Sequence, residues 1–368
     1  MARFLTVVLG IWAAMHSYVF WRLSSVPWIS AHVPAWLIGL VGGVLWSSYI
    51  LARILDARGL QASVWPLEYV AANWIGFLFL LFWSLAAVDI VTLGGWAFPR
   101  EAPMIRGWAA VVALLLAVIA LIQASRPPVL REHEVALKGL PPERDGTVLV
   151  AVSDLHLGNL LGRTWLSRLV TRLTAMKPDL LVIAGDLVDG NVGRVEPLLE
   201  VLKQLRAPLG VWAVTGNHEF YAGLEKSVQL FRDSGFRVLR DSHEQAAPGL
   251  ILAGVDDLTA RDQLGMENHA VDKALGQRPA GGTIFLSHSP CQAEDAARAG
   301  AGLMLSGHTH NGQLWPFNYF VRLQYPLLAG RYDVNGMPVI VCRGTGTWGP
   351  RMRLWRPSEI LRIRLRAR

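Results

Sequence analysis

The stretch VLVAVSDLHLGNLLGRTWLSRLVTRLTAMKPDLLVIAGDLVDG, residues 148–190, decides the fold of the second half of the chain. Two compact apolar runs, residues 147–153 and 180–184, are typical of buried strands. Between them, residues 164–176 carry apolar side chains at helical spacing, and Lys177-Pro178-Asp179 ends that helix. A strand, a helix and a second strand in this order predict two parallel strands joined by a crossover helix.

The same alternation continues downstream and predicts an α/β domain with a largely parallel sheet. We expect helices at residues 195–205 and 224–234, and an early strand at residues 132–137. Further strands are expected at residues 210–215, 237–239, 250–255, 283–286, 303–305, 339–342 and 360–365. Sheets of this class place their ligand crevice at the carboxyl ends of the strands.

Polar motifs follow five of these strands and supply side chains that commonly ligate divalent metals. The candidate ligands are Asp154, His156, Asp186, Asn217, His288, His308 and His310. In an extended segment, residues two apart point to the same side, so each of the pairs 154/156 and 308/310 is expected to address one place. With Asp186 counted twice as a bridge, these side chains make two four-ligand sets. The sequence therefore predicts a two-metal site.

Such a site is suited to phosphoester hydrolysis. Two cations about 3.5–4 Å apart neutralise a phosphate group and acidify a water held in line with the leaving oxygen. His218 is the candidate general acid for the leaving group, and Asp189 is the candidate carboxylate that orients its ring. The expected cofactors are two divalent metal ions, and manganese, iron and zinc all suit these ligands.

The order of the motifs, D-x-H, G-D-x-x-D, G-N-H-E, H and G-H-x-H, resembles that of the calcineurin-like metallophosphoesterases. The resemblance spans residues 147–365 and implies a four-layer α/β/β/α sandwich of two mixed sheets flanked by helices. It also implies one metal held by Asp154, His156, Asp186 and His310. The other would be held by Asp186, Asn217, His288 and His308, with His218 and Asp189 as the catalytic pair.

Residues 216–223 and 343–347 look like those of the membrane-associated bacterial phosphoesterases in this superfamily. Asn311 departs from their usual glycine, at a position that can require positive φ, which asparagine tolerates. The resemblance implies hydrolysis of a phosphodiester or of the pyrophosphate of a lipid-linked substrate such as UDP-2,3-diacylglucosamine. The aromatic residues at 315–320 are interpreted either as a lipid-facing lip or as a cluster packed under a loop, with the packed cluster favoured.

The first third of the chain has a different character. Residues 1–125 contain no lysine and ten of the fifteen tryptophans. Uncharged stretches at residues 4–21, 23–52, 69–88 and 107–125 match the roughly 20 apolar residues that cross a bilayer as a helix. The second helix is expected to begin near Pro34, because proline is tolerated in a first helical turn. We predict an all-α module of four transmembrane helices.

These observations divide the chain into a four-helix transmembrane module at residues 1–125, a connector at 126–146 and a catalytic domain at 147–368. The positive-inside rule favours a catalytic domain in the cytoplasm, and the resemblance favours a bacterial inner membrane. Cys291 and Cys342 form no disulfide framework, and we expect no nucleic-acid partner. Two alternatives remain open: an anchored nucleotide or phosphoprotein phosphatase, and a non-catalytic membrane sensor that binds phosphorylated ligands.

Overall fold

The computed structural model describes residues 2–58, 61–266 and 269–368, with side chains omitted for 2–5, 57 and 61–63. The chain divides into two compact units. The first comprises residues 1–125 and 349–354, and the second comprises residues 126–348 and 355–368. The predicted catalytic domain therefore contributes one short segment to the first unit. In that segment, the Arg353 amide donates to Ala120 O at 3.0 Å and the Arg351 amide donates to Asn73 Oδ1 at 3.0 Å.

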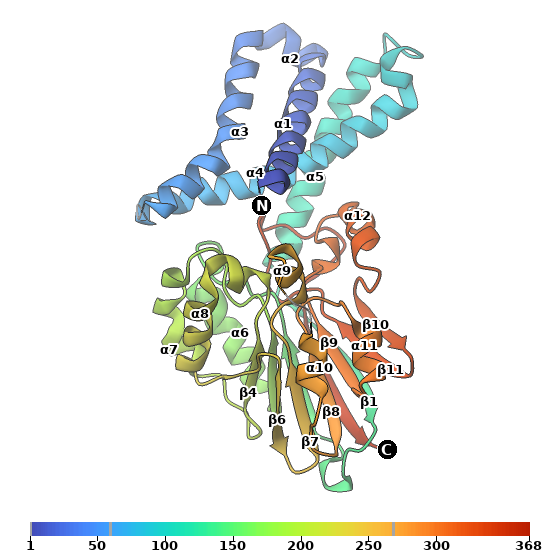
Figure 1. The fold of residues 1–368 in the computed structure, drawn as a ribbon. Coiled ribbons are helices and arrows are strands. Elements are labelled where there is room, and N and C mark those ends of the chain that lie inside the picture. The colour runs from blue at the N-terminus through green and yellow to red at the C-terminus, as the bar shows by residue number, and fades with distance from the viewer. Residues whose placement is uncertain (1, 59–60, 267–268) are drawn as a thin grey trace. The chain divides into compact units, whose positions relative to one another are not determined.

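The first unit is helical, as predicted (Figure 1). Its helices are α1 (Ala2–Ser24), α2 (Pro27–His32), α3 (Ala35–Ala57), α4 (Gln61–Thr92) and α5 (Ala102–Ser125). Within the described part of the chain, three stretches are long and apolar enough to cross a membrane: Ala35–Asp56, Val64–Gly95 and Ala102–Ser125. The role of α1 as a fourth span stays a prediction. Pro34 directly precedes α3, where the sequence places the start of that helix.

The apolar helices of this unit hold a group of charged side chains around Asp89. Asp89 on α4 forms ion pairs with Arg22 at 2.6 Å and with Arg106 at 2.9 Å. The Tyr18 hydroxyl also donates to Asp89, at 2.6 Å. Charges in an apolar setting are tolerated when they are paired and hydrogen-bonded, so this cluster explains how α1, α4 and α5 accommodate them.

In the second unit, the described residues form two six-stranded mixed sheets. The first has the order β1-β12-β2-β3-β4-β5 and the second the order β10-β11-β9-β8-β7-β6. The strands of the first sheet are β1 (Val129–Leu137), β2 (Val148–Val152), β3 (Leu180–Ala184), β4 (Val211–Val214), β5 (Arg237–Val238) and β12 (Glu359–Ala367). Those of the second are β6 (Ser242–Ala247), β7 (Leu250–Gly254), β8 (Gly282–Leu286), β9 (Leu303–Ser306), β10 (Gly330–Val334) and β11 (Met337–Val341).

Three apolar cores fix the layers of this unit. One lies between the sheets and includes Trp212 from β4 and Leu286 from β8. A second lies beneath α6 (Arg163–Ala175), α7 (Leu199–Leu202) and α8 (Asn217–Asp233) on the outer face of the first sheet. A third lies beneath α10 (Ala270–Leu275) and α11 (Ala293–Arg298) on the second sheet (Figure 1). The predicted four-layer α/β/β/α sandwich is confirmed.

Some local predictions differ from the structure. The predicted connector contains β1, which pairs with β12 along its whole length, so its strand begins at Val129 rather than at residue 132. The helix predicted at 195–205 is shorter in the structure, where 3₁₀ turns at Val192–Arg194 and Glu196–Leu198 precede α7. Strands β6 and β10 were not predicted, because these polar edge strands lack the apolar pattern of buried ones.

Candidate metal centre

The candidate ligands converge at one edge of the two sheets. Asp154 and His156 follow β2, Asp186 follows β3, and Asn217 begins α8 after β4. The second sheet contributes the others: His288 follows β8, and His308 and His310 follow β9. All seven side chains named from the sequence therefore lie at the carboxyl ends of strands, where the prediction placed them.

The backbone that presents these candidate ligands is not extended, so residues two apart need not point to the same side. Asp154 and His156 still share one group, but His308 and His310 belong to different groups, which corrects that expectation. Five of the seven candidate ligands have positive φ, between 47° and 71°: Asp154, His156, Asp186, His308 and His310. The chain must turn sharply where each strand ends, and the left-handed conformation provides that turn. Asn311 also has positive φ, at 51°, so asparagine replaces glycine there without leaving the required conformation.

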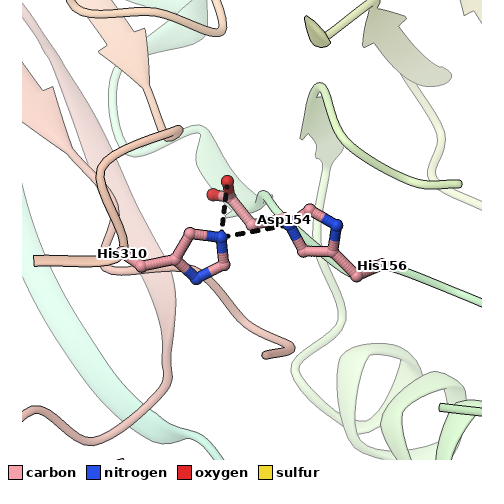
Figure 2. Close-up of side chains that lie close together, drawn as sticks. All are labelled: Asp154, His156 and His310. Atoms are coloured by element: carbon pink, nitrogen blue, oxygen red, sulfur yellow. Dashed lines mark hydrogen bonds and ion pairs between the residues drawn. The ribbon is translucent and has the colours of Figure 1, made fainter. Parts of the chain in front are cut away.

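One group of ligand atoms belongs to Asp154, His156 and His310, which are all buried (Figure 2). The two imidazole Nε2 atoms lie 3.0 Å apart, and His310 Nε2 lies 3.3 Å from Asp154 Oδ1. Two imidazole nitrogens that face each other share either a proton or a cation. A divalent cation bound by all three side chains satisfies every one of these atoms.

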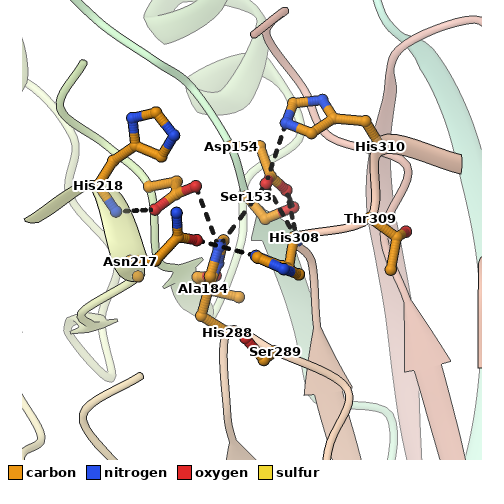
Figure 3. A network of polar contacts seen from close by, with 12 residues as sticks. Ser153, Asp154, Ala184, Asn217, His218, His288, Ser289, His308, Thr309 and His310 are labelled. Atoms are coloured by element: carbon orange, nitrogen blue, oxygen red, sulfur yellow. Dashed lines mark hydrogen bonds and ion pairs between the residues drawn. The ribbon is translucent and has the colours of Figure 1, made fainter. Parts of the chain in front are cut away.

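A second group belongs to Asp186, His288 and His308 (Figure 3). His288 Nδ1 donates to the carbonyl of Ala184 at 2.8 Å, and its Nε2 lies 3.1 Å from Asp186 Oδ2. Burial lowers the pKa of His288, but Asp186 outweighs that effect and raises it well above its ordinary value, so without a metal Nε2 carries a proton toward Asp186. A divalent cation would take the place of that proton.

Asp186 lies between the two groups of candidate ligands, and Asn217 lies beside the second group. The same Oδ2 atom of Asp186 lies 3.7 Å from His156 Nε2, so this carboxylate faces both groups. Asn217 Oδ1 lies 2.8 Å from His308 Nδ1. Neutral imidazole, carboxylate and amide oxygen together fit manganese, iron or zinc.

The charge state of the buried groups also fits metal binding. Burial lowers the pKa of His156 to about 4 and that of His308 to about 3, so both imidazoles are neutral ligands at neutral pH. Burial raises the pKa of Asp154 to about 6. For Asp186, burial acts in the same direction, but the nearby His288 outweighs it and holds the pKa well below its ordinary value.

The predicted catalytic pair is formed beside the first group. His218 Nδ1 lies 3.1 Å from Asp189 Oδ1, and the His218 ring lies 4.6 Å from that of His156. Burial lowers the pKa of His218, but Asp186 and Asp189 outweigh that effect and raise it to about 9. The exposed rings of Tyr221 and Trp348 lie 5.6 Å and 6.1 Å from His218.

Glu219 supports the candidate site in a way that the sequence did not reveal. Its place in the G-N-H-E motif is the only sequence feature that points to it. Its buried carboxylate accepts the backbone N–H groups of Asp186, Val188 and Gly216, at 3.0, 2.9 and 2.6 Å. Burial and the nearby Asp186 raise the pKa of Glu219 to about 7, whereas the backbone donors favour its carboxylate form. Glu219 therefore ties the loop after β3 to the loop after β4.

The aromatic segment after the last motif is partly exposed and is not packed under a loop, which corrects the favoured interpretation. Trp315 is 40% exposed and Tyr319 is 59% exposed. Leu323, also on α12 (Phe317–Gln324), is 84% exposed. The physical reason is the amphipathic character of this short helix, which buries Asn318 and turns apolar side chains outward.

Comparisons with known proteins agree with this site. Residues 147–312 match the family model described as calcineurin-like phosphoesterase. A Danio rerio transmembrane protein with a metallophosphoesterase domain is 38% identical over 271 residues, covering 70% of this chain and 62% of that protein. A metallophosphoesterase of Aquifex aeolicus is 33% identical over 247 residues, covering 64% of this chain and 91% of that protein.

The resemblance is thus not confined to bacterial proteins, because a Bos taurus transmembrane protein with a metallophosphoesterase domain is also 37% identical. This chain spans about 62% of the length of the Danio rerio and Bos taurus proteins. Among solved structures, a 5'-nucleotidase precursor of Thermus thermophilus is 18% identical, with a TM-score of 0.35, over 54% of this chain and 49% of that one. The family match over the motif-bearing residues and the near-complete coverage of the Aquifex aeolicus relative show that this chain belongs to the calcineurin-like phosphoesterase family.

Proposed function

We propose that this protein is a membrane-anchored phosphoesterase with two divalent metals, which hydrolyses a phosphodiester or pyrophosphate bond. One metal would be held by Asp154, His156, Asp186 and His310, and the other by Asp186, Asn217, His288 and His308. The observation that carries this proposal is the meeting of two three-residue ligand groups that both face Asp186. The identity of the metals is left to experiment, with manganese as the first to test.

When bound, the two cations supply charge neutralisation at the phosphate and a water of lowered pKa. The protein's own residues supply proton transfer to the leaving oxygen. His218 carries a proton on the ring, and Asp189 at 3.1 Å fixes the ring orientation and stabilises the protonated form. The His218 backbone N–H also donates to Asp186 Oδ1 at 2.9 Å, so the acid is positioned relative to the shared carboxylate. Water is the nucleophile, without a covalent enzyme intermediate.

We further propose that the substrate is amphiphilic, with UDP-2,3-diacylglucosamine as one candidate. The support is the presence of three membrane-length apolar helices in the same chain. Tethering raises the effective concentration of the active site toward anything held in the same bilayer. A bacterial inner membrane, with the catalytic unit in the cytoplasm, is the location that suits such a substrate.

The test is manganese-dependent hydrolysis of bis(p-nitrophenyl) phosphate by the detergent-purified chain. His218→Ala should lower the activity on this good leaving group less than the activity on a phosphodiester with a poor leaving group. His269→Ala, which changes an exposed histidine at the start of α10, should leave both activities unchanged. Lipid-linked and soluble substrates are then compared in one preparation. Equal turnover of soluble nucleotides or phosphopeptides would favour the anchored phosphatase. Metal and ligand binding without any turnover would favour a membrane sensor.

A further inference from the structure

His308 has a polar partner on each ring nitrogen. Its Nδ1 lies 2.8 Å from Asn217 Oδ1, on the side of the proposed metal, and its Nε2 lies 2.9 Å from the Tyr325 hydroxyl. The two rings meet edge to face, with centroids 4.8 Å apart. Tyr325 directly follows α12, and nothing in the sequence motifs points to it.

The Tyr325 hydroxyl begins a chain of side-chain hydrogen bonds that leads away from the metal site. Tyr325 Oη lies 3.2 Å from Thr259 Oγ1, and Thr259 Oγ1 lies 2.7 Å from Ser289 Oγ. Ser289 Oγ donates to Asp257 Oδ2 at 2.5 Å. Asp257 and Ser289 are completely buried, and Tyr325 is 8% exposed. The chain thus joins three segments that are distant in sequence.

Counting protons fixes the direction of the bonds between Asp257, Ser289 and Thr259. Asp257 Oδ1 accepts the Ala260 N–H at 2.7 Å while its Oδ2 accepts from Ser289, so both oxygens act as acceptors. Each hydroxyl has a single proton to donate. Since Ser289 gives its proton to Asp257, Thr259 must donate to Ser289.

Thr259 then has no proton left for Tyr325 and can only accept from it. When Tyr325 donates there, its oxygen accepts the Nε2 proton of His308, which is the arrangement required when a cation occupies Nδ1. The Gln324 amide, 3.4 Å from the same oxygen, is also a donor and agrees with this role. The donor-to-acceptor order of these hydrogen bonds, which begins at Asp257, therefore extends to His308.

We propose that Tyr325, Thr259, Ser289 and Asp257 are positioning residues that hold the His308 proton on Nε2, so that the Nδ1 lone pair faces Asn217 Oδ1 and a divalent cation. This inference rests on the second metal site of the proposed function. Partners of the distal nitrogen orient a metal-bound histidine, and their loss typically weakens metal affinity about 10- to 100-fold. The ordered chain also links the metal site to the start of α9 (Leu258–Gln263) and to the end of α12.

The test measures manganese binding to the full-length chain in detergent micelles after chelator treatment. The electron paramagnetic resonance signal of free Mn²⁺ gives the number of bound ions and their dissociation constants. Thr259→Val keeps the tyrosine but removes the acceptor of its proton, and Tyr325→Phe removes the hydroxyl itself. Each should weaken one of the two ions about 10- to 100-fold. Wild-type affinity for both ions in these two variants would overturn the inference.

Matched variants control for folding. Thr259→Ser retains the hydroxyl and should keep wild-type affinity. Tyr332→Phe should also keep it, because the Tyr332 hydroxyl accepts the backbone N–H groups of Leu328 and Ala329 at 3.0 and 3.2 Å instead of contacting a ligand. Asp257→Asn can donate to Ser289 and so reverse the chain, and it should resemble Thr259→Val.

A second measurement separates failure of this inference from failure of the proposed function. The ¹⁵N resonances of histidine-labelled, metal-free protein report which ring nitrogen of His308 carries the proton. Without a cation, the Asn217 amide must turn its NH2 group toward Nδ1 for this tautomer. We then expect an Nε2 proton in the wild type and transfer toward Nδ1 in Thr259→Val. If the wild type binds fewer than two manganese ions, the proposed function fails. In that case the spectrum alone decides, and an Nδ1 proton in the wild type overturns the hydroxyl chain.

Discussion

Gly185 immediately precedes Asp186 and lies against a second candidate ligand. Its φ is +82°, and a Cβ at this position would lie 2.6 Å from His288 Nδ1 and 2.7 Å from His288 Cγ. The imidazole cannot easily retreat, because the same Nδ1 atom donates to Ala184 O at 2.8 Å. We therefore expect Gly185→Ala to destabilise the fold in two ways, through backbone strain and through displacement of the His288 ring.

The two contributions can be separated with a matched control. Gly336, in the turn between β10 and β11, has φ of +80°, and a Cβ added there would meet no atom within 4 Å, so Gly336→Ala introduces backbone strain alone. A left-handed alanine costs about 1–2 kcal/mol. Overpacking in a tight interior costs about 1–3 kcal/mol more. The expected losses of unfolding free energy are thus about 1–2 kcal/mol for Gly336→Ala and about 2–5 kcal/mol for Gly185→Ala.

Thermal unfolding and manganese titration measure both effects. For a domain of about this size, each kcal/mol lowers Tm by about 2–4 °C, so Gly185→Ala should unfold roughly 4–20 °C below the wild type and Gly336→Ala roughly 2–8 °C below it. Metal sites tolerate ligand shifts of only about 0.2 Å, so Gly185→Ala should also weaken binding of one manganese ion. If both variants lose equal stability and keep wild-type affinity, the contact with His288 has no energetic role and the reasoning is refuted.

Further expectations concern the catalytic acid and the metals. His218→Ala should lower kcat about 10²- to 10⁴-fold on substrates with poor leaving groups while both manganese ions stay bound, and loss of the metals instead would show that His218 is a ligand. Chelation should lower Tm, because Asp154 and Asp186 then lie buried without cations. At metal concentrations 100 times Kd each bound ion contributes about 2.7 kcal/mol, and a chelator-insensitive Tm would contradict metal binding. In metal-free protein the pKa of His218, about 9, lies above its unfolded value of 6.5. The stability advantage over His218→Gln should therefore be full below pH 6.5 and vanish as pH rises through 9, and a pH-independent difference in urea unfolding would contradict that shift.

The sequence predicted where the candidate ligands converge better than it predicted the layers. Strong apolar runs located the buried strands, and a polar motif at the end of five of them located the candidate ligands. Periodicity alone indicated one largely parallel sheet, whereas the second sheet followed from the family resemblance. The edge strands β6 and β10 have polar sequences, because one side of such a strand needs no partner, and they gave no signal. Local patterns thus identified the buried strands and missed two of the four edge strands among the described residues.

The hydroxyl chain could not be predicted for a different reason. Thr259, Ser289 and Tyr325 come from three segments that meet only in the folded protein, and each is a common residue with an ordinary local role. Glu219 differs, because it stands inside a motif, yet its three contacts with backbone N–H groups depend on loops from two strands. Residues that touch the metal can be identified from their chemistry. Residues that orient those ligands are identified only by their contacts.

The backbone of the site indicates that the ligands are in place before any metal binds. Five candidate ligands have positive φ, and each such non-glycine residue costs on the order of 1–3 kcal/mol. Interactions of the protein itself hold them there. Asp154 N–H donates to Gly185 O and His156 N–H donates to Asp186 O, both at 3.0 Å, so the loops continue the pairing of β2 with β3 beyond the strands. Because the folded scaffold stores this strain, metal binding here need not drive folding, unlike in small zinc domains that unfold without their ion.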